Sequence, residues 1–77
     1  MAGDISVEIS LGEGHELERV YDAWIKSLPA DQRPGHFIVQ GLPGADGWQQ
    51  YILNGDARFR THLEKSGLTF KNFEVRT

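Results

Sequence analysis

The sequence predicts an α+β fold in which the chain runs β-α-β-β-α-β. Three observations support this: strict apolar–polar alternation near the N-terminus, two segments with apolar residues at helical spacing, and clusters of glycine and proline that separate short apolar runs. We expect a four-stranded antiparallel sheet with two helices on one face. With 77 residues, the chain is long enough to enclose only one core, so we expect a single domain over 1–77.

The first predicted elements are a strand and a helix. Residues 4–11 alternate polar and apolar side chains, which is typical of a strand with one face on a core and the other in water. Over residues 17–28, apolar residues recur at steps of three and four, which places them on one side of a helix. Pro29 ends this helix, because proline cannot continue the hydrogen-bond pattern.

A loop and a second strand follow. Residues 29–35, PADQRPG, contain two prolines and polar residues, so they predict a loop. Residues 36–40, HFIVQ, are apolar on both faces at their centre. This pattern is typical of an interior strand of a sheet.

The glycine-rich stretch 41–53, GLPGADGWQQYIL, predicts a loop that leads into a third strand over 48–53. Pro43-Gly44 suits a type II turn, and Asp46-Gly47 suits a bulged return into the strand. Trp48 then lies where the strand begins. Because tryptophan prefers burial, we expect Trp48 to pack over the end of the sheet, and an exposed contact residue is the alternative.

The last third of the chain predicts a helix and a strand. Asn54-Gly55-Asp56 supplies a turn and a candidate N-cap, and Phe59 and Leu63 mark the buried side of a short helix. Gly67 is expected to end that helix in the left-handed conformation. Residues 68–75 are rich in β-favouring side chains and predict the final strand.

This order of elements resembles the ferredoxin-like split βαβ sandwich over nearly the whole chain. Within that plan, residues 63–76, LEKSGLTFKNFEVR, look like the end of an ACT-type regulatory domain. The resemblance implies a small-ligand site in the loop from Leu11 to His15, formed by Gly12, Glu13, Gly14 and His15. Because this loop is acidic, it would favour an amine over a phosphate.

Charge and composition disfavour several classes of function. The net charge of −3 argues against nucleic-acid binding, which depends mainly on cations that neutralise phosphates. RNA-recognition motifs share this element order, but the first strand here has no aromatic residue, and only Phe37 and Tyr51 are candidates for stacking on bases. No membrane segment or secretion signal is recognisable, so we expect a cytoplasmic protein.

No catalytic or metal-binding group of residues is evident, and we expect no metal and no cofactor. The chain has no cysteine, which excludes a cysteine nucleophile and a thiolate metal site. Its three histidines are far apart in the sequence, although His15 has Glu13 and Glu16 beside it. Glu8 and Glu74 could face each other across neighbouring strands, but water-exposed strand faces commonly carry such residues. Catalysis is therefore less favoured than binding.

Our first hypothesis is a small non-catalytic module that binds a protein partner stoichiometrically, as an inhibitor, adaptor or regulatory subunit of the size that phages and mobile elements encode. The candidate contact residues are of types that binding interfaces favour: Trp48, Gln49, Tyr51, Arg58 and Arg60. An edge position for the strand of Trp48 would allow a partner or a second copy to add a strand, which would make a homodimer.

Two alternatives remain open at this point. One is an ACT-like domain that senses a small ligand through the loop from Leu11 to His15. The other is a small oligomeric enzyme that uses His15 or His36 as an acid or a base.

Overall fold

The computed structural model describes residues 3–43 and 46–76. The predicted β-α-β-β-α-β order is confirmed. In chain order, the elements are β1 (Gly3–Ser10), α1 (Gly14–Ser27), the short 3-10 helix η1 (Ala30–Gln32), β2 (Ile38–Pro43), β3 (Trp48–Gly55), α2 (Arg58–Ser66) and β4 (Phe70–Arg76).

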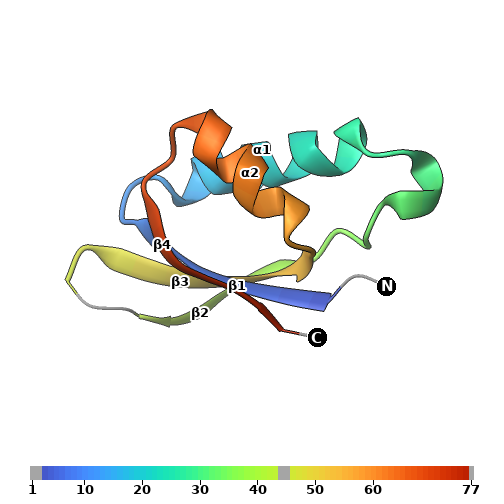
Figure 1. Cartoon of the computed structure of the whole chain (residues 1–77). Coiled ribbons are helices and arrows are strands. Elements are labelled where there is room, and N and C mark those ends of the chain that lie inside the picture. The colour runs from blue at the N-terminus through green and yellow to red at the C-terminus, as the bar shows by residue number, and fades with distance from the viewer. Residues whose placement is uncertain (1–2, 44–45, 77) are drawn as a thin grey trace.

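The four strands form one antiparallel sheet in the order β2-β3-β1-β4. Figure 1 shows both helices on one face of this sheet, and within residues 3–43 and 46–76 the opposite face carries no helix. The protein therefore has the predicted ferredoxin-like, two-layer α+β architecture. The side of the sheet away from the helices is called the open face below.

The core lies between the sheet and the two helices. In β1, Ile5, Val7 and Ile9 are fully buried against the helices, and the polar residues between them point to the open face. The helices contribute the side chains that complete this core, among them the fully buried Leu17, Tyr21, Phe59 and Leu63. The apolar residues that alternate in β1 and those at helical spacing in α1 therefore pack against each other in one core.

The positions of two strands differ from the sequence-based expectation. The apolar segment 36–40, expected in the interior of the sheet, contributes to β2, which is an outer strand. The strand of Trp48, for which the sequence left an edge position open, is β3, which lies between β2 and β1. The apolar composition of residues 36–40 suggested burial on both faces of the strand, but Phe37 is 49% exposed and Val39 is 42% exposed.

The glycine signals are confirmed where the structure describes them. Gly67 ends α2 with φ of 83°, as expected for a left-handed C-cap. Gly47 has φ of 85°, and its carbonyl accepts a hydrogen bond from the backbone N–H of Leu11 at 2.8 Å. The expected Pro43-Gly44 turn lies partly outside the described residues.

The side chain of Tyr21 joins three segments of the fold. Its hydroxyl donates a hydrogen bond to the carbonyl of Asn54 near the end of β3, and it accepts one from the backbone N–H of Phe37, just before β2. The ring is fully buried and packs against Phe59 of α2 at 5.6 Å between ring centroids. Tyr21 therefore fixes α1 to the place where β2 and β3 meet.

Replacing Tyr21 with phenylalanine should lower the free energy of unfolding by about 1–3 kcal/mol, because the carbonyl of Asn54 and the N–H of Phe37 would lose their partner. Urea unfolding followed by circular dichroism measures this change. Tyr51→Phe is the matched control, since the hydroxyl of Tyr51 makes no hydrogen bond within the described residues. Equal losses in the two variants would contradict the assignment.

Candidate functional site

The outer edge of β2 presents backbone groups that pair with none of the strands in the described part of the chain. The carbonyl of Phe37 accepts a hydrogen bond from the N–H of Asn54 at 3.1 Å, so Phe37 points its backbone groups toward β3. Because these directions alternate along an antiparallel strand, the N–H and C=O groups of Ile38 and Gln40 point away from the sheet. This row of donors and acceptors could accept an additional strand.

The same strand carries exposed apolar side chains and no charge. The stretch from Phe37 to Pro43 contains neither an acidic nor a basic residue. Phe37, Val39 and Leu42 are 49%, 42% and 77% exposed. Val39 lies opposite Ile52 of β3, whose side chain extends this apolar surface over the open face. These four residues and the outer backbone of β2 are called the β2 surface.

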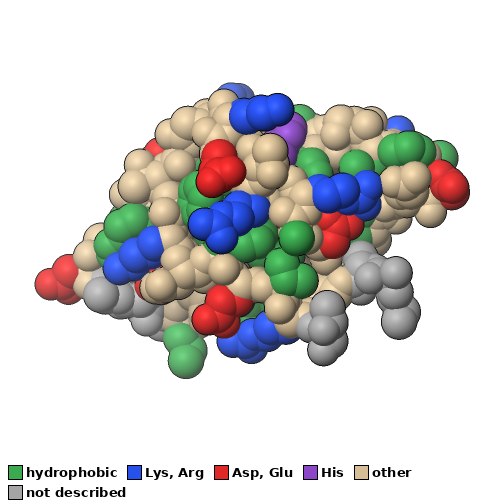
Figure 2. Space-filling model, in the orientation of Figure 1, with side chains coloured by type: hydrophobic (Ala, Val, Ile, Leu, Met, Phe, Trp, Pro, Cys, Tyr) green, Lys and Arg blue, Asp and Glu red, His purple; other side chains and the backbone are tan. Residues whose placement is uncertain are grey.

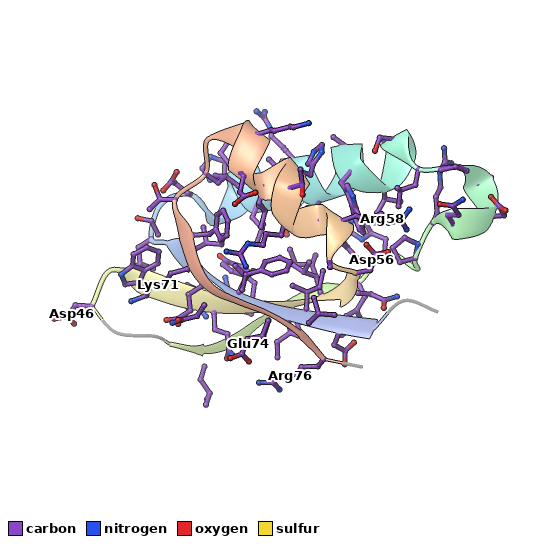
Figure 3. The ribbon with its side chains drawn as sticks, in the orientation of Figure 1. Asp46, Asp56, Arg58, Lys71, Glu74 and Arg76 are labelled. Atoms are coloured by element: carbon purple, nitrogen blue, oxygen red, sulfur yellow. The ribbon has the colours of Figure 1, made fainter. Side chains whose placement is uncertain are left out.

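The opposite edge of the sheet, β4, is built differently. Its open-face side carries Lys71, Glu74 and Arg76, and Figure 3 shows Glu74 and Arg76 below the sheet, away from the helices. The pairing of β4 with β1 is interrupted between Ser6 and Glu8, where Asn72 has φ of 54°. Charges and bulges of this kind discourage the addition of a further strand.

The molecular surface on the side of α2 and β4 is rich in charged side chains. Figure 2, seen from the side of α2 and β4, shows acidic and basic side chains interspersed over this face. An interspersed surface of this kind is typical of a region that stays in contact with water. Of the two outer strands, β2 is therefore the one whose edge is unprotected.

Two glutamine side chains fasten β2 to β3 where their pairing is irregular. The register shifts between Gln40 and Pro43. There the amide of Gln49 donates to the carbonyl of Gly41 at 3.1 Å, and the amide oxygen of Gln50 accepts from the N–H of Leu42 at 3.2 Å. These internal hydrogen bonds occupy the amide of Gln49, which the sequence suggested as a contact residue.

A hollow of about 270 Å³ lies between the start of α1 and β2. Two residues of the predicted small-ligand loop, Gly14 and His15, line it together with Glu18 of α1. The remaining lining residues come from β2 and β3: Ile38, Val39, Gln40 and Tyr51. The structure thus brings Gly14 and His15 together with Tyr51, although sequence reasoning placed them in separate candidate sites. Gly12 and Glu13 are not among the lining residues.

The close approach of Tyr51 explains why position 14 is a glycine. A Cβ atom there would lie 2.0 Å from the hydroxyl oxygen of Tyr51, closer than any nonbonded contact allows. The absence of a side chain at Gly14 therefore lets the phenol of Tyr51 reach the start of the helix. The glycine fits this approach of the ring and implies no phosphate-binding loop.

Trp48 is neither in the core nor fully exposed. It is half-buried and pairs with Ser10 of β1, which places it on the open face. The ammonium group of Lys71 lies 4.5 Å from the centre of its ring, a cation–π arrangement. The expectation that Trp48 packs over the end of the sheet is therefore met only in part, because its cover is a lysine side chain.

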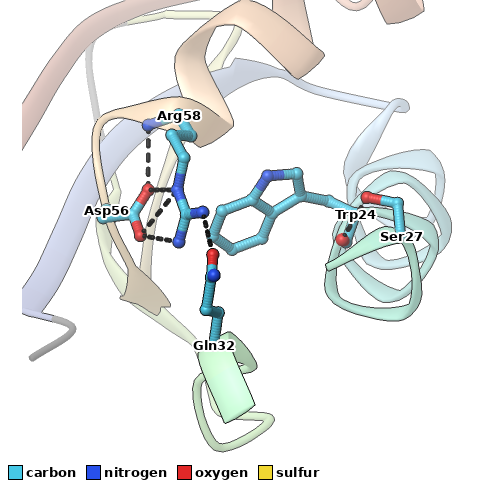
Figure 4. Close-up of polar contacts among 5 residues, drawn as sticks. All are labelled: Trp24, Ser27, Gln32, Asp56 and Arg58. Atoms are coloured by element: carbon cyan, nitrogen blue, oxygen red, sulfur yellow. Dashed lines mark hydrogen bonds and ion pairs between the residues drawn. The ribbon is translucent and has the colours of Figure 1, made fainter. Parts of the chain in front are cut away.

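The two candidate arginines lie on α2. Figure 4 shows Arg58 between Asp56 and Gln32: its guanidinium donates to the carboxylate of Asp56, at 2.7 Å for the shortest contact, and to the side-chain oxygen of Gln32 at 2.9 Å. Arg60 is exposed, 3.9 Å from Glu64. Arg58 therefore ties η1 to the start of α2, and neither arginine lies beside Trp48 or the β2 surface.

Asp56 caps the start of α2. The N-cap position is Ala57, one residue later than the sequence indicated, but a carboxylate oxygen of Asp56 accepts the backbone N–H of Arg58 at 2.9 Å. Hydrogen bonding to the Arg58 guanidinium lowers the pKa of Asp56 below its usual value.

The side chains of the three histidines contact different residues and form no cluster among the described residues. His15 is exposed, with its ring 3.5 Å from Glu16, while His36 packs on Tyr21 and His62 stacks on Phe59. In residues 3–43 and 46–76, no group of three or more His, Asp or Glu side chains could hold a metal ion.

Glu8 and Glu74 do lie on the same face, as the sequence suggested. Both line a polar hollow of about 200 Å³ on the open face, together with Arg76 and Asn72, whose amide donates to the carboxylate of Glu8. A nearby arginine and a hydrogen-bonded amide give these carboxylates ordinary surface partners. Nothing in this arrangement assigns either carboxylate a catalytic role.

Sequence reasoning missed Val39 and Leu42 as surface residues and considered Phe37 only as a residue that could stack on bases. A signal that could have found them is the seven-residue stretch FIVQGLP, which is mostly apolar and has no charged residue to protect an exposed strand edge. The sequence instead predicts an interior strand over residues 36–40 and a loop from Gly41 onward, because an interior strand and an unprotected edge strand have similar composition.

Comparisons with protein-family models, with curated proteins and with solved structures returned no match to this chain. The function must therefore be argued from the geometry. Within the described residues, neither α1 nor α2 has the length and apolar sequence needed to cross a bilayer.

Acid should destabilise the wild type more than an Asp56→Asn variant. Because the pKa of Asp56 is lowered in the folded state, its contribution to stability is present above the usual carboxyl pKa and is lost as the pH falls through the lowered value. We expect the wild type to lose about 1 kcal/mol more than the variant between neutral and strongly acidic pH. Urea unfolding at both pH values measures this.

Asp31→Asn is the control for this measurement, since Asp31 is exposed and makes no ion pair within the described residues. It should keep the wild-type acid dependence. The same reduced acid dependence in both variants would show that the Asp56–Arg58 contact is not its source.

Proposed function

We propose that this protein is a small non-catalytic binding module that accepts an extended segment of a partner protein along β2. The observation that supports the proposal is the contrast between the two edges of the sheet. The edge at β2 has outward backbone groups, exposed apolar side chains and no charge, whereas β4 carries charges and a bulge. This is the arrangement that strand addition requires.

Strand addition would use backbone and side chains in different ways. An incoming strand would exchange hydrogen bonds with the N–H and C=O groups of Ile38 and Gln40, and these bonds are independent of the partner's sequence. Specificity would come from apolar side chains of the partner that pack on Phe37 and Val39. Burial of this exposed apolar area contributes roughly 25 cal/mol per Å².

The charge around β2 favours a different protein over a second copy. The net charge is −3, and Glu18 lines the hollow directly beside β2. A second copy at this edge would bring a like-charged surface close to the first. A partner segment with basic residues beside its apolar ones would complement both features.

This proposal assigns the protein a stoichiometric role as an inhibitor, adaptor or regulatory subunit. Binding by one strand edge needs no catalytic group, so it does not require the three separated histidines to act together. A small, preorganised edge also binds without a large ordering cost, because the strand that receives the partner is already held by β3.

Replacing Val39 with lysine should weaken partner binding roughly tenfold or more, because a charge on an edge strand opposes the addition of another strand. The measurement is affinity capture from a lysate of the native host with the wild type and the variant, followed by identification and purification of a protein recovered at near-equal stoichiometry. Calorimetry then measures the affinity of this recovered partner for the wild type and for the Val39→Lys variant.

Val75→Lys is the matched control, since Val75 is 38% exposed on the protected edge strand β4. This variant should bind as the wild type does. Equal affinities for the Val39 and Val75 variants, or failure to recover any partner with the wild type, would count against strand addition at β2.

Amide hydrogen exchange offers a second measurement that needs no mutation. In the isolated protein, the amide protons of Ile38 and Gln40 should exchange quickly and that of Val39 slowly, and a bound partner should slow the exchange at Ile38 and Gln40. NMR exchange rates at two protein concentrations test this. Slow exchange at Ile38 and Gln40 that depends on concentration would instead indicate pairing between two copies.

A further inference from the structure

We propose that the extended segment accepted by β2 alternates apolar and basic residues, with an apolar residue opposite Val39 and a lysine or arginine on either side of it. This inference rests on the strand addition proposed above, and it specifies the side chains of the partner that the two faces of β2 would contact.

Successive side chains of β2 point to opposite faces of the sheet. Ile38 pairs with the fully buried Leu53, so its side chain lies on the helix side. Gln40, two residues later, lies on the same side, whereas Val39 between them pairs with Ile52 and points to the open face. Because paired residues of neighbouring strands share a face, a strand added to β2 must follow the same alternation.

On the helix side, the added strand would meet the hollow between α1 and β2. Ile38 and Gln40 line the hollow from β2, and Glu18 lines it from α1. Glu18 is exposed and has no ion-pair partner within residues 3–43 and 46–76. A volume of about 270 Å³ is small for a whole ligand and sufficient for one side chain of the partner.

A lysine or arginine suits this hollow better than an acidic or a short polar residue. Its aliphatic stem would pack along Ile38, and its charged end would reach the carboxylate of Glu18. His15 also lines the hollow, but its ring nitrogen lies 3.5 Å from a carboxylate oxygen of Glu16. An acidic side chain at the same place would be repelled by Glu18, and the net charge of −3 adds to this preference.

On the open face, the residue opposite Val39 would meet an apolar surface. Phe37 and Val39 are 49% and 42% exposed, and Ile52 lies opposite Val39 on β3. The backbone groups of Val39 point toward β3, as those of Phe37 do, so in antiparallel addition the partner residue opposite Val39 forms a pair without hydrogen bonds, in which side chains come closest. A charged residue there would lose water without gaining a partner. An apolar residue, above all a β-branched one, is therefore expected at this position.

The experiment is an NMR titration of the full chain, at neutral pH and low salt, with an acetylated and amidated peptide of sequence Thr-Lys-Val-Lys-Val-Thr. The matched control peptide, Thr-Val-Val-Lys-Lys-Thr, has the same composition and charge but does not alternate. We expect the first peptide, at millimolar concentration, to shift the amide resonances of Ile38 and Gln40 and to bind at least threefold more tightly than the second. Equal binding of the two peptides, or no shift with either, would overturn the proposal.

A pair of variants tests the role of Glu18. Glu18→Gln removes the carboxylate that would bind the cation and keeps the length of the side chain, so the variant should fold. It should weaken binding of the alternating peptide about two- to fivefold, the range of an exposed ion pair. Glu64→Gln changes the net charge equally but lies on α2 outside the hollow, so it should bind as the wild type does. Equal losses in the two variants would indicate an effect of net charge alone and would overturn the assignment of Glu18.

The outcome separates from that of strand addition itself. If a captured partner slows amide exchange at Ile38 and Gln40 but binds the Glu18→Gln variant as tightly as the wild type, strand addition stands and the alternating pattern fails. If neither the peptide nor a captured partner protects these amides, both proposals fail.

Discussion

The hydroxyl of Tyr21 holds together the three segments on which the rest of the structure depends. It donates to the carbonyl of Asn54 near the end of β3 and accepts from the N–H of Phe37, the residue before β2, while its ring, carried by α1, is buried against Phe59 of α2. One side chain of α1 therefore fixes the helix layer and the place where β2 and β3 meet at once. Both helices lie on one face of the sheet, and β2 is an outer strand whose open-face side they do not cover.

A sheet with helices on one face has two edges, and these two edges are not equivalent. At β4, Lys71, Glu74 and Arg76 and the irregularity at Asn72 oppose any further pairing. At β2, the internal amide bonds of Gln49 and Gln50 stabilise the strand from inside without placing a charge at its outer side. A protein that avoids association protects both edges, so the asymmetry is a physical argument for a partner.

The secondary structure was predictable, whereas the candidate sites were predictable only in part. The loop residues Gly14 and His15 do border a hollow, but Tyr51, which lines the same hollow, comes from a strand that is distant in sequence. Trp48 and Arg58 have the side chains that interfaces favour, yet one is covered by Lys71 and the other is bonded to Asp56 and Gln32. Residue type indicates what a side chain can bind, and the neighbours determine whether it is available.

The sequence by itself determined the order of elements, the buried side of β1, the end of α1 just before Pro29 and the left-handed end of α2 at Gly67, because each depends on local periodicity or backbone conformation. Only the tertiary structure decided which strand lies at an edge. Pairing between strands is made by backbone atoms that every residue shares, so composition alone could not separate β2 from β3. The stretch FIVQGLP, apolar and uncharged, suits an interior strand and an unprotected edge equally, and the fold leaves it outside.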